Sequence, residues 1–568
     1  MEEYAINSHK NLISDCSSCC KMKFLKDITP REYQQKIFET CKDKNCLVVI
    51  PTGLGKTLIA LMLTIERMTQ FPSEKVVFLA PTKPLIEQHF KYFQKHLPEL
   101  FAQMELFTGK VPAGQRKKLW QSADIIFSTP QCVGNDLKNN LYNLKEVSLL
   151  IEDESHRCLK NYSYTYIVQE YHKQAQNIRV LGLTASPGSD KEKIQQICKN
   201  LGVTSIEART RESEDVKHYL QELKFNTIQI EFPDKFKEIR DLLLIIYNKK
   251  TEELKNRKLL FFHATKVSLL ELQGRIMHSI STGNKNFNLL VGASVCAQAI
   301  KIQHAIELLE TQTLYSFNSY IQELFKQAEQ GKSKAVQHLV KTPEFNQAYT
   351  KTIELIAKKI EHPKLLELKS LTEYKFSKNP KAKIIIFAQY RNTTVQICKE
   401  LNSIPGVRAK VFVGQAKRGE GETATGLNQK EQQEIVRQFS LGEINILVAT
   451  SIGEEGLDIP EVNAVIFYEP IPSAIRKIQR AGRTARSIPG ELDILVTKAT
   501  RDEAYYWAAF HKEKKMHSAL NSIKEEMENG TFNLEENKNK SSEEIPEKNQ
   551  KGNLKKEKTK GEKQKKLF

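Results

Sequence analysis

Short apolar runs alternate with longer segments of helical periodicity along two stretches of the chain. In residues 25–205 the expected strands are 46–50, 76–80, 124–128, 148–152 and 179–184, separated by helical segments such as 57–68 and 84–97. In residues 371–517 they are 383–388, 409–413, 444–450, 464–469 and 492–497. Alternation of strand and helix is typical of a parallel sheet with helices on both faces. The hydrophobic pattern therefore predicts an α/β protein with two parallel-sheet domains.

Between these stretches, residues 206–370 carry apolar positions at helical spacing, with few Pro or Gly. The expected helices are 236–260, 265–280, 289–310 and 314–330. We therefore predict an all-helical insertion domain between the two sheets. At the chain ends, residues 1–24 are polar and predict an irregular arm, and residues 518–568 are rich in Lys and Glu and predict a disordered tail.

The charge is strongly basic. The 568 residues include 86 Lys and Arg against 68 Asp and Glu, a formal net charge of +18. Residues 521–568 hold 12 Lys and 10 Glu, so most of the excess lies on the predicted domains. A basic folded surface favours a polyanionic partner, most often nucleic acid, although Lys-rich chains can also be merely soluble.

Cysteine content and hydropathy bear on the compartment. Ten cysteines in a chain of this length do not make a disulfide framework, and they indicate a reducing compartment. The N-terminus lacks the apolar core of a signal peptide, and no uninterrupted apolar run approaches the length of a membrane span. We expect no membrane association and a cytoplasmic, nucleoid-associated protein.

The segment PTGLGKT predicts a nucleotide site because it joins an expected strand to an expected helix. Gly53 and Gly55 let backbone N–H groups curl around phosphate oxygens, and the helix amino end adds partial positive charge. Lys56 would neutralise the β and γ phosphates, and the Thr57 hydroxyl would ligate Mg²⁺.

The segment DESH follows the apolar run 148–151. Two carboxylates at the carboxyl end of a strand lie where parallel sheets bind ligands. Asp153 would hold Mg²⁺ through its water shell, and Glu154 would orient or deprotonate the attacking water. The alternative is a solvated acidic turn; the phosphate loop upstream favours the functional interpretation.

The segment QRAGRTAR supplies cations without a phosphate loop of its own. Arg483 and Arg486 are three residues apart and would share one face if the segment is helical, and Gln479 would lie on the same segment. Both arginines could reach a γ-phosphate across a cleft and stabilise the charge that develops in transfer. The alternative is a basic surface helix. In the functional interpretation, the two domains bind one nucleotide between them, as the domains of a motor protein do.

Nine segments, in the order that superfamily-two helicases show, span residues 31–486. They are REYQ (31–34), PTGLGKT (51–57), APTKPL (80–85), STP (128–130), DESH (153–156), TAS (184–186), FAQYR (387–391), ATSIGEEGLDIP (449–460) and QRAGRTAR (479–486). The chain resembles this superfamily, and its helical block with the run HPKLLELK resembles the archaeal Hef helicases and their eukaryotic relative FANCM. The resemblance implies two RecA-like domains, ATP and Mg²⁺ as cofactors, and DNA as the partner.

The resemblance also implies a role for each matching residue. The nucleotide set is Arg31, Gln34, Pro51, Thr52, Gly53, Leu54, Gly55, Lys56, Thr57, Gly456 and Asp458, in which Gln34 and Arg31 would read the adenine edge. The DNA-strand set is Pro81, Thr82, Lys83, Thr108, Gly109, Ser128, Thr129, Pro130, Gln389, Arg391, Thr450 and Ser451. Thr184 and Ser186 would couple hydrolysis to the strand contacts. Hydroxyls, backbone amides and cations suit a grip on phosphates that is independent of sequence.

The departures from the family pattern remove no charged catalytic group, so we expect activity. Ile50 stands where the general phosphate loop has Gly, which matches the helicase form of the loop; Ser155 replaces a usual Ala, and Ala485 a usual Gly. The nuclease signature of many Hef proteins is absent, so we expect no nuclease activity. The last residues, QKKLF, resemble the start of a sliding-clamp peptide; the alternative is a solvated Lys-rich end.

The sequence therefore predicts an ATP-dependent DNA helicase or translocase that moves 3′ to 5′ and remodels forks or junctions in DNA repair. Direction and fork preference rest on the resemblance. One alternative is an RNA-stimulated helicase of the duplex-RNA sensor or Dicer type, which shares these motifs and a helical insertion. The other is a DNA-binding scaffold whose ATPase has decayed.

Overall fold

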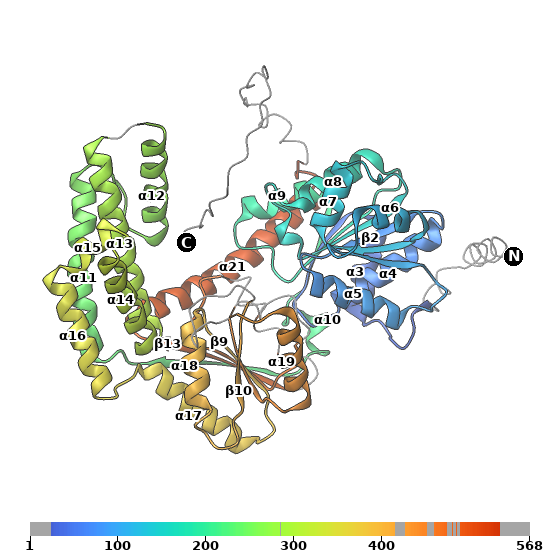
Figure 1. Cartoon of the computed structure of the whole chain (residues 1–568). Helices are drawn as coiled ribbons and strands as arrows, with labels where there is room; N and C mark the ends of the chain where they lie inside the picture. Colours follow the sequence, from blue (N-terminus) through green and yellow to red (C-terminus); the bar gives the residue numbers. More distant parts are fainter. Residues whose placement is uncertain are drawn as a thin grey trace, which may run out of the picture.

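The protein forms two parallel sheets and a helical bundle (Figure 1), which confirms the predicted α/β class with a helical insertion. The computed structural model describes residues 24–283, 286–414, 426–450, 459–473, 480, 484 and 489–533. Most of the predicted arm and the predicted clamp-binding end fall outside the described residues.

The first sheet has seven strands in the order β3-β4-β2-β5-β6-β1-β7. They are β1 (Cys46–Val49), β2 (Lys75–Leu79), β3 (Met104–Phe107), β4 (Ile125–Ser128), β5 (Val147–Asp153), β6 (Val180–Thr184) and β7 (Ser205–Ala208). Side chains alternate between the two faces, so Val48 and Phe78 enter one core while Leu47 and Val77 enter the other.

Helices cover both faces of this sheet. On one face lie α3 (Glu32–Asp43), α4 (Lys56–Gln70), α5 (Lys83–His96) and α10 (Glu214–Lys217). On the other lie α6 (Ala113–Ser122), α7 (Pro130–Lys138), α8 (Ser163–Gln174) and α9 (Lys191–Leu201). Pro84 and Pro130 stand in the first turns of α5 and α7, where the fixed φ of proline favours helix initiation. This arrangement leaves the carboxyl edge of the sheet to the connecting loops.

The second sheet has six parallel strands in the order β10-β11-β9-β12-β13-β8. They are β8 (Leu223–Ile230), β9 (Ile384–Phe387), β10 (Ala409–Phe412), β11 (Ile446–Ala449), β12 (Ala464–Phe467) and β13 (Gly490–Thr497). Its helices are α17 (Pro363–Lys378), α18 (Arg391–Leu401) and α19 (Gln429–Leu441).

The prediction of an all-helical insertion domain over residues 206–370 is wrong at both ends: one end contains a strand, and the helix at the other end packs on the second sheet. Strand β8 pairs along its whole length with β13 of the second sheet, and α17 buries Leu365 and Leu368 in the core of that sheet. Most side chains of β8 are exposed or half-buried, because it is an edge strand, so it lacks the continuous apolar run by which the other strands were predicted.

The helices between β8 and α17 form the bundle. They are α11 (Asp234–Asn256), α12 (Lys266–Ser281), α13 (Phe287–Thr311), α14 (Leu314–Glu329), α15 (Lys334–Val340) and α16 (Pro343–Ala357). By length and composition alone, one helix among the described residues, α13, could cross a membrane. It buries Ile302 and Ile306 against α11, and Cys296 and Ala299 against α12, as the core helix of a bundle does.

The predicted disordered tail begins too early. Helix α21 runs from Arg501 to Glu528, and its last turns bury Met516, Leu520 and Ile523 in the core of the first sheet. These residues lie at helical spacing, which marks one apolar face. Figure 1 shows α21 crossing from the bundle and the second sheet to α9 of the first domain.

Candidate nucleotide site and strand-contact edge

Apart from Arg31 and Gln34 at the start of α3, the predicted site residues of the first domain end or follow its strands at their carboxyl ends, where parallel sheets bind ligands. The phosphate loop, DESH and TAS follow or end β1, β5 and β6, which are neighbours in the sheet. The predicted strand contacts follow β2, β3 and β4, which form the other half. The predicted nucleotide residues and the predicted DNA-strand contacts thus occupy two halves of one edge, the nucleotide half and the DNA-strand half, which meet where β2 pairs with β5.

The phosphate loop has the backbone that phosphate binding requires. Gly53 and Gly55 have φ of 89° and 76°, and Gly55 is the residue from which α4 starts. A Cβ at Gly55 would lie 2.3 Å from the Gln34 amide nitrogen, so the position accepts only glycine without rearrangement. The Lys56 ammonium donates to the Ile50 carbonyl at 3.0 Å.

The predicted adenine-reading residues lie against this loop. The Gln34 amide donates to the Leu54 carbonyl at 3.0 Å and accepts from the Arg31 backbone N–H at 2.8 Å. The Tyr33 hydroxyl donates to the same carbonyl at 2.8 Å. The Arg31 guanidinium lies 5.1 Å from the centre of the Tyr219 ring, which arrives from the segment after β7. The sequence did not suggest Tyr219 as a neighbour of the predicted adenine-reading residues.

The two predicted Mg²⁺ ligands are joined by a third side chain. His89 of α5 lies with Nδ1 3.3 Å from the Thr57 hydroxyl and Nε2 2.9 Å from a carboxylate oxygen of Asp153. Burial raises the pKa of Asp153, but the contact with His89 and the charge of Lys56 outweigh it and hold that pKa below its usual range. A hydroxyl and an ionised carboxylate are the oxygen donors that Mg²⁺ prefers, so these residues fit the metal.

Glu154 stands at the start of a connected series of polar contacts. It adopts a left-handed conformation, φ 52°, directly after β5, and its carboxylate lies 3.2 Å from His156 Nδ1. The same nitrogen lies 3.2 Å from the Thr184 hydroxyl, and that hydroxyl oxygen accepts the Ser186 N–H at 3.1 Å. The Ser186 hydroxyl donates to the sulfur of Met516 at 2.9 Å. The predicted coupling segment therefore connects DESH with α21.

The predicted strand contacts of the first domain differ in exposure. Pro81, Thr108, Ser128 and Pro130 are buried, and the Ser128 hydroxyl donates to the Phe107 carbonyl at 3.1 Å. The more exposed members are Thr82, Lys83, Gly109 and Thr129. Pro81 and Pro130 have no backbone N–H, so among the buried members only Thr108 and Ser128 have one that could donate to a phosphate.

The described strand contacts of the second domain follow β9 and β11, which are neighbours. Gln389 is exposed, Arg391 donates to the Gly414 carbonyl at 3.1 Å, and Thr450 is buried at the end of β11. The remaining predicted residues lie outside the described residues; these are Ser451, Gly456, Asp458, Gln479, Arg483 and Arg486.

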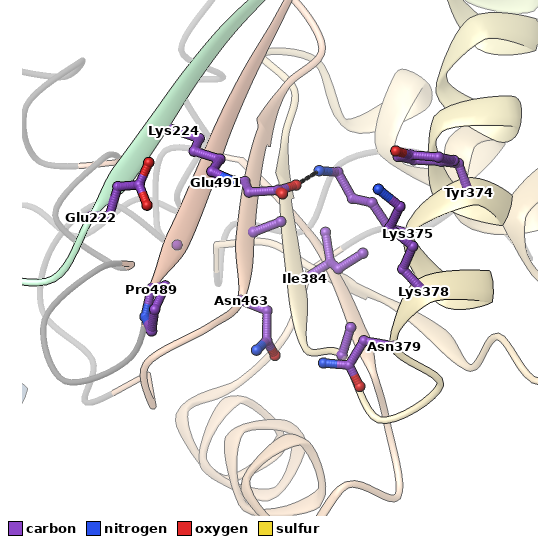
Figure 2. Close-up of a pocket in the computed structure, with 13 residues that line it drawn as sticks. Glu222, Lys224, Tyr374, Lys375, Lys378, Asn379, Ile384, Asn463, Pro489 and Glu491 are labelled. Atoms are coloured by element: carbon purple, nitrogen blue, oxygen red, sulfur yellow. Dashed lines mark hydrogen bonds and ion pairs between the residues drawn. The ribbon is translucent and has the colours of Figure 1, made fainter.

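Two cavities lie in the part of the chain that the structure describes. A cavity of about 560 Å³ lies between the domains, lined among others by Thr52, Ala185, Phe225 and Met516. A smaller one of about 250 Å³ lies at the amino ends of β9, β12 and β13, the opposite edge of the second sheet (Figure 2). In the smaller cavity the ammonium of Lys375 pairs with Glu491 of the wall and with Asp493, so its charge is satisfied without a ligand.

Comparison with known proteins follows the same division of the chain. Residues 31–194 match the DEAD/DEAH box helicase family, residues 364–487 the helicase conserved C-terminal domain, and residues 235–360 the helical bundle of a putative ATP-dependent RNA helicase family. The crystal structure of the Hef helicase domain of Pyrococcus furiosus matches with a TM-score of 0.65 at 41% identity, over 84% of this chain and 98% of that one. The chain belongs to the Hef and FANCM family of superfamily-two helicases.

Curated members of the Hef and FANCM family and its neighbours carry both RNA and DNA names. A putative ATP-dependent RNA helicase of Methanocaldococcus jannaschii is 37% identical over 501 residues, 88% of this chain and 61% of that protein. An ATP-dependent DNA helicase of Sclerotinia sclerotiorum is 33% identical over 500 residues, 84% of this chain and 40% of that protein. The chain spans about half the length of these relatives.

Within this Hef and FANCM family member, the two departures in the first domain have local explanations. Ile50 is fully buried in the core beneath the phosphate loop. The Ser155 hydroxyl donates to the Leu183 carbonyl at 3.1 Å and so fastens DESH to β6. The sequence missed His89, which lies six residues beyond Lys83 on the buried face of α5 with Ile86.

Proposed function

We propose that the protein is an ATP-dependent DNA helicase or translocase that moves 3′ to 5′ and remodels branched DNA such as forks and junctions in repair. The observation that carries this proposal is the order of strands in the first sheet, which brings the predicted nucleotide residues and the predicted DNA-strand contacts to neighbouring strands of one edge. Family membership supports the same function, and the DNA name of the Sclerotinia relative supports the substrate.

Hydrolysis would use the described residues as follows. Gly53, Gly55 and the amino end of α4 bind the phosphates, and Lys56 neutralises them. Glu154 positions the attacking water, held in its left-handed conformation after β5. Thr57 and Asp153 would hold Mg²⁺, which supplies charge neutralisation at the phosphates when bound. Gln34 and Arg31 would read the adenine.

Residues of the second domain complete this proposal. Arg483 and Arg486, with Gln479, Gly456 and Asp458, would meet the nucleotide from across the cleft, as the family resemblance implies. Closure on ATP and release after hydrolysis would then move a strand held by both domains. Replacement of Arg483 by Ala should abolish hydrolysis and leave nucleotide binding by the first domain within about threefold, because an arginine finger acts mainly on the transition state.

The bundle would contact the branch of the DNA. Phe261 and Phe262, between α11 and α12, are 72% and 78% exposed, and Lys255 and Lys258 just before them are exposed as well. Aromatic side chains beside cations suit stacking on unpaired bases. Replacing both phenylalanines by Ala should weaken fork binding by at least about tenfold, since stacking contributes 1–3 kcal/mol per base. Leu100→Ala, at an equally exposed apolar residue of the first domain, is the matched control. Unchanged fork binding by the double variant would exclude this role.

An RNA substrate is the second candidate, because the Methanocaldococcus relative and the matched bundle family carry RNA names. ATPase rates with forked DNA, single-stranded DNA and duplex RNA separate the two. We expect forked DNA to stimulate most; stimulation by RNA alone would replace the proposal. Displacement assays with either end of the loading strand blocked would give the direction. Lys56→Ala should abolish remodelling; retention of remodelling would identify a scaffold with a dispensable ATPase.

A further inference from the structure

The His89 imidazole forms a bridge between the phosphate loop and DESH. Its two ring nitrogens reach the Thr57 hydroxyl at 3.3 Å and the Asp153 carboxylate at 2.9 Å. One neutral tautomer satisfies both contacts: Nε2–H donates to the carboxylate, and Nδ1 accepts the Thr57 O–H. In that arrangement the lone pairs of the Thr57 oxygen remain for a cation. The ring therefore orients both predicted Mg²⁺ ligands at once.

The ring is held in place by packing. His89 is 7% exposed, and its ring centre lies 4.5 Å from that of Phe78 on β2. Phe78 in turn packs against Phe93 and Phe127, with ring centres 5.7 and 5.5 Å away. A side chain confined in this way keeps its hydrogen bonds at little further entropic cost, so it can fix the direction of a carboxylate.

The same helix, α5, also reaches the DNA-strand half of the edge, where the predicted DNA-strand contacts lie. Helix α5 begins at Lys83, directly after the predicted strand contacts Pro81 and Thr82. His89 is six residues further on, about 9 Å along the helix axis. Strands β2 and β5 pair side by side, with Leu79 opposite Glu152, so α5 starts beside the strand that carries Asp153. If a bound DNA strand displaced the amino end of α5, the His89 imidazole would therefore move relative to Asp153.

We propose that His89 is the positioning residue that aims Asp153 at Mg²⁺ and, through α5, makes the metal site respond to the bound strand. The inference rests on the proposed helicase function for its strand part only. Its metal part concerns nucleotide binding, which can be measured without nucleic acid. Partners that orient metal-ligating carboxylates contribute about 10–100-fold to metal affinity or activity.

Three substitutions divide the bridge into its halves. His89→Leu removes both contacts; His89→Gln places an amide near the Nε2 position and keeps the bond to Asp153; His89→Asn places one near Nδ1 and keeps only the bond to Thr57. His96→Gln is the matched control, because His96 is an equally buried histidine of the same helix whose Nδ1 faces the Lys26 backbone carbonyl at 2.9 Å.

The first measurement is binding of a fluorescent ADP to the full chain across a Mg²⁺ titration, without nucleic acid. We expect the Mg²⁺ concentration for half-maximal effect to rise 10–100-fold in the Leu and Asn variants and less than threefold in the Gln and His96→Gln variants. Wild-type Mg²⁺ dependence in the Leu variant would overturn the positioning role. Failure of the wild type itself to bind the nucleotide would instead overturn the proposed function.

The second measurement is the ratio of ATPase rates with and without forked DNA at saturating Mg²⁺. We expect the ratio to fall at least fivefold in His89→Leu and to be retained in His96→Gln and His89→Gln. A fall of the basal and stimulated rates by the same factor would reduce His89 to a metal-site residue and overturn the link to the strand. Equal thermal midpoints of the variants exclude a folding defect as the cause.

Discussion

Glu469 is a buried carboxyl group whose ionisation should control the stability of the second domain. It lies two residues beyond β12, is 2% exposed, and accepts the backbone N–H of Gln389, a predicted strand contact. Burial raises its pKa to about 7; the cations Lys364 and Arg480 lower it, and Asp502 raises it. The group is therefore protonated in much of the folded protein at neutral pH.

The sign of the pH effect follows from the raised pKa. The folded pKa of about 7 exceeds the ordinary 4.5 of an unfolded Glu. The contribution of Glu469 to the free energy of unfolding is therefore complete below pH 4.5 and is lost as the pH rises through 7. The difference of about 2.5 units corresponds to about 3 kcal/mol of the free energy of unfolding. Most of this loss falls between pH 5 and 8. Glu469→Gln cannot ionise and should not show it.

Hydrogen exchange followed by mass spectrometry, applied to peptides from β9 and β12, measures the local free energy of opening at each pH. From pH 5 to pH 8, the free energy of opening of Glu469→Gln should rise relative to that of the wild type by about 2–3 kcal/mol. Glu443→Gln, at an exposed carboxylate of the same domain, is the control: its free energy of opening should differ from that of the wild type by the same amount at pH 5 and at pH 8. Parallel pH profiles for Glu469→Gln and wild type would refute a neutral buried Glu469.

Three further substitutions test the described contacts. Gly55→Ala forces a left-handed alanine whose Cβ meets Gln34, and should cost about 1–3 kcal/mol and weaken nucleotide binding, measured by titration calorimetry. Lys364→Met leaves the buried carboxylate of Asp502 without the ammonium now 2.5 Å away; urea unfolding should show a loss of about 3–5 kcal/mol, partly restored when Asp502→Asn is added. Burial raises the pKa of Glu152 well above its usual range, so the free energy of unfolding of the wild type falls as the pH rises above 4.5. Glu152→Met should therefore be more stable than the wild type by about 1–3 kcal/mol at pH 8 and by less at pH 5, as measured by thermal midpoints.

Most of the strands that the sequence predicted correctly are buried on both faces; the exception is the edge strand β10, in which Lys410 is exposed. Each of β1, β2, β4, β5 and β6 carries a continuous buried run, and so do β9, β11 and β12 of the second sheet. The three missed strands, β3, β7 and β8, are all sheet edges with half-exposed side chains. An edge strand is defined by its pairing partner, and pairing between distant segments leaves little trace in local hydropathy.

The site divides in a similar way. Residues such as Lys56 and Asp153 could be predicted because their chemistry demands particular types at particular spacings after a strand. His89 and Met516 could not, because each acts through a contact between segments far apart in the chain. One signal was present for His89: with Ile86 and Phe93 it shares the apolar face of α5, where a histidine must find polar partners.

Helix α21 connects these observations, because it contacts all three parts of the molecule along about 42 Å. Its first turn is held to the second domain and the bundle by directional contacts. Asp502 forms a fully buried ion pair with Lys364 of α17, and Arg501 donates to the Gln303 carbonyl of the bundle. Its far end rests on the first domain through apolar side chains and through partly exposed polar contacts, in which Lys191 pairs with Ser522 and Glu526, and Gln195 donates to Glu526. Apolar contacts are non-directional and tolerate sliding, whereas a buried ion pair does not survive separation. When the domains close around a nucleotide, α21 should therefore move with the second domain and the bundle, and slide past the Ser186 hydroxyl of the first.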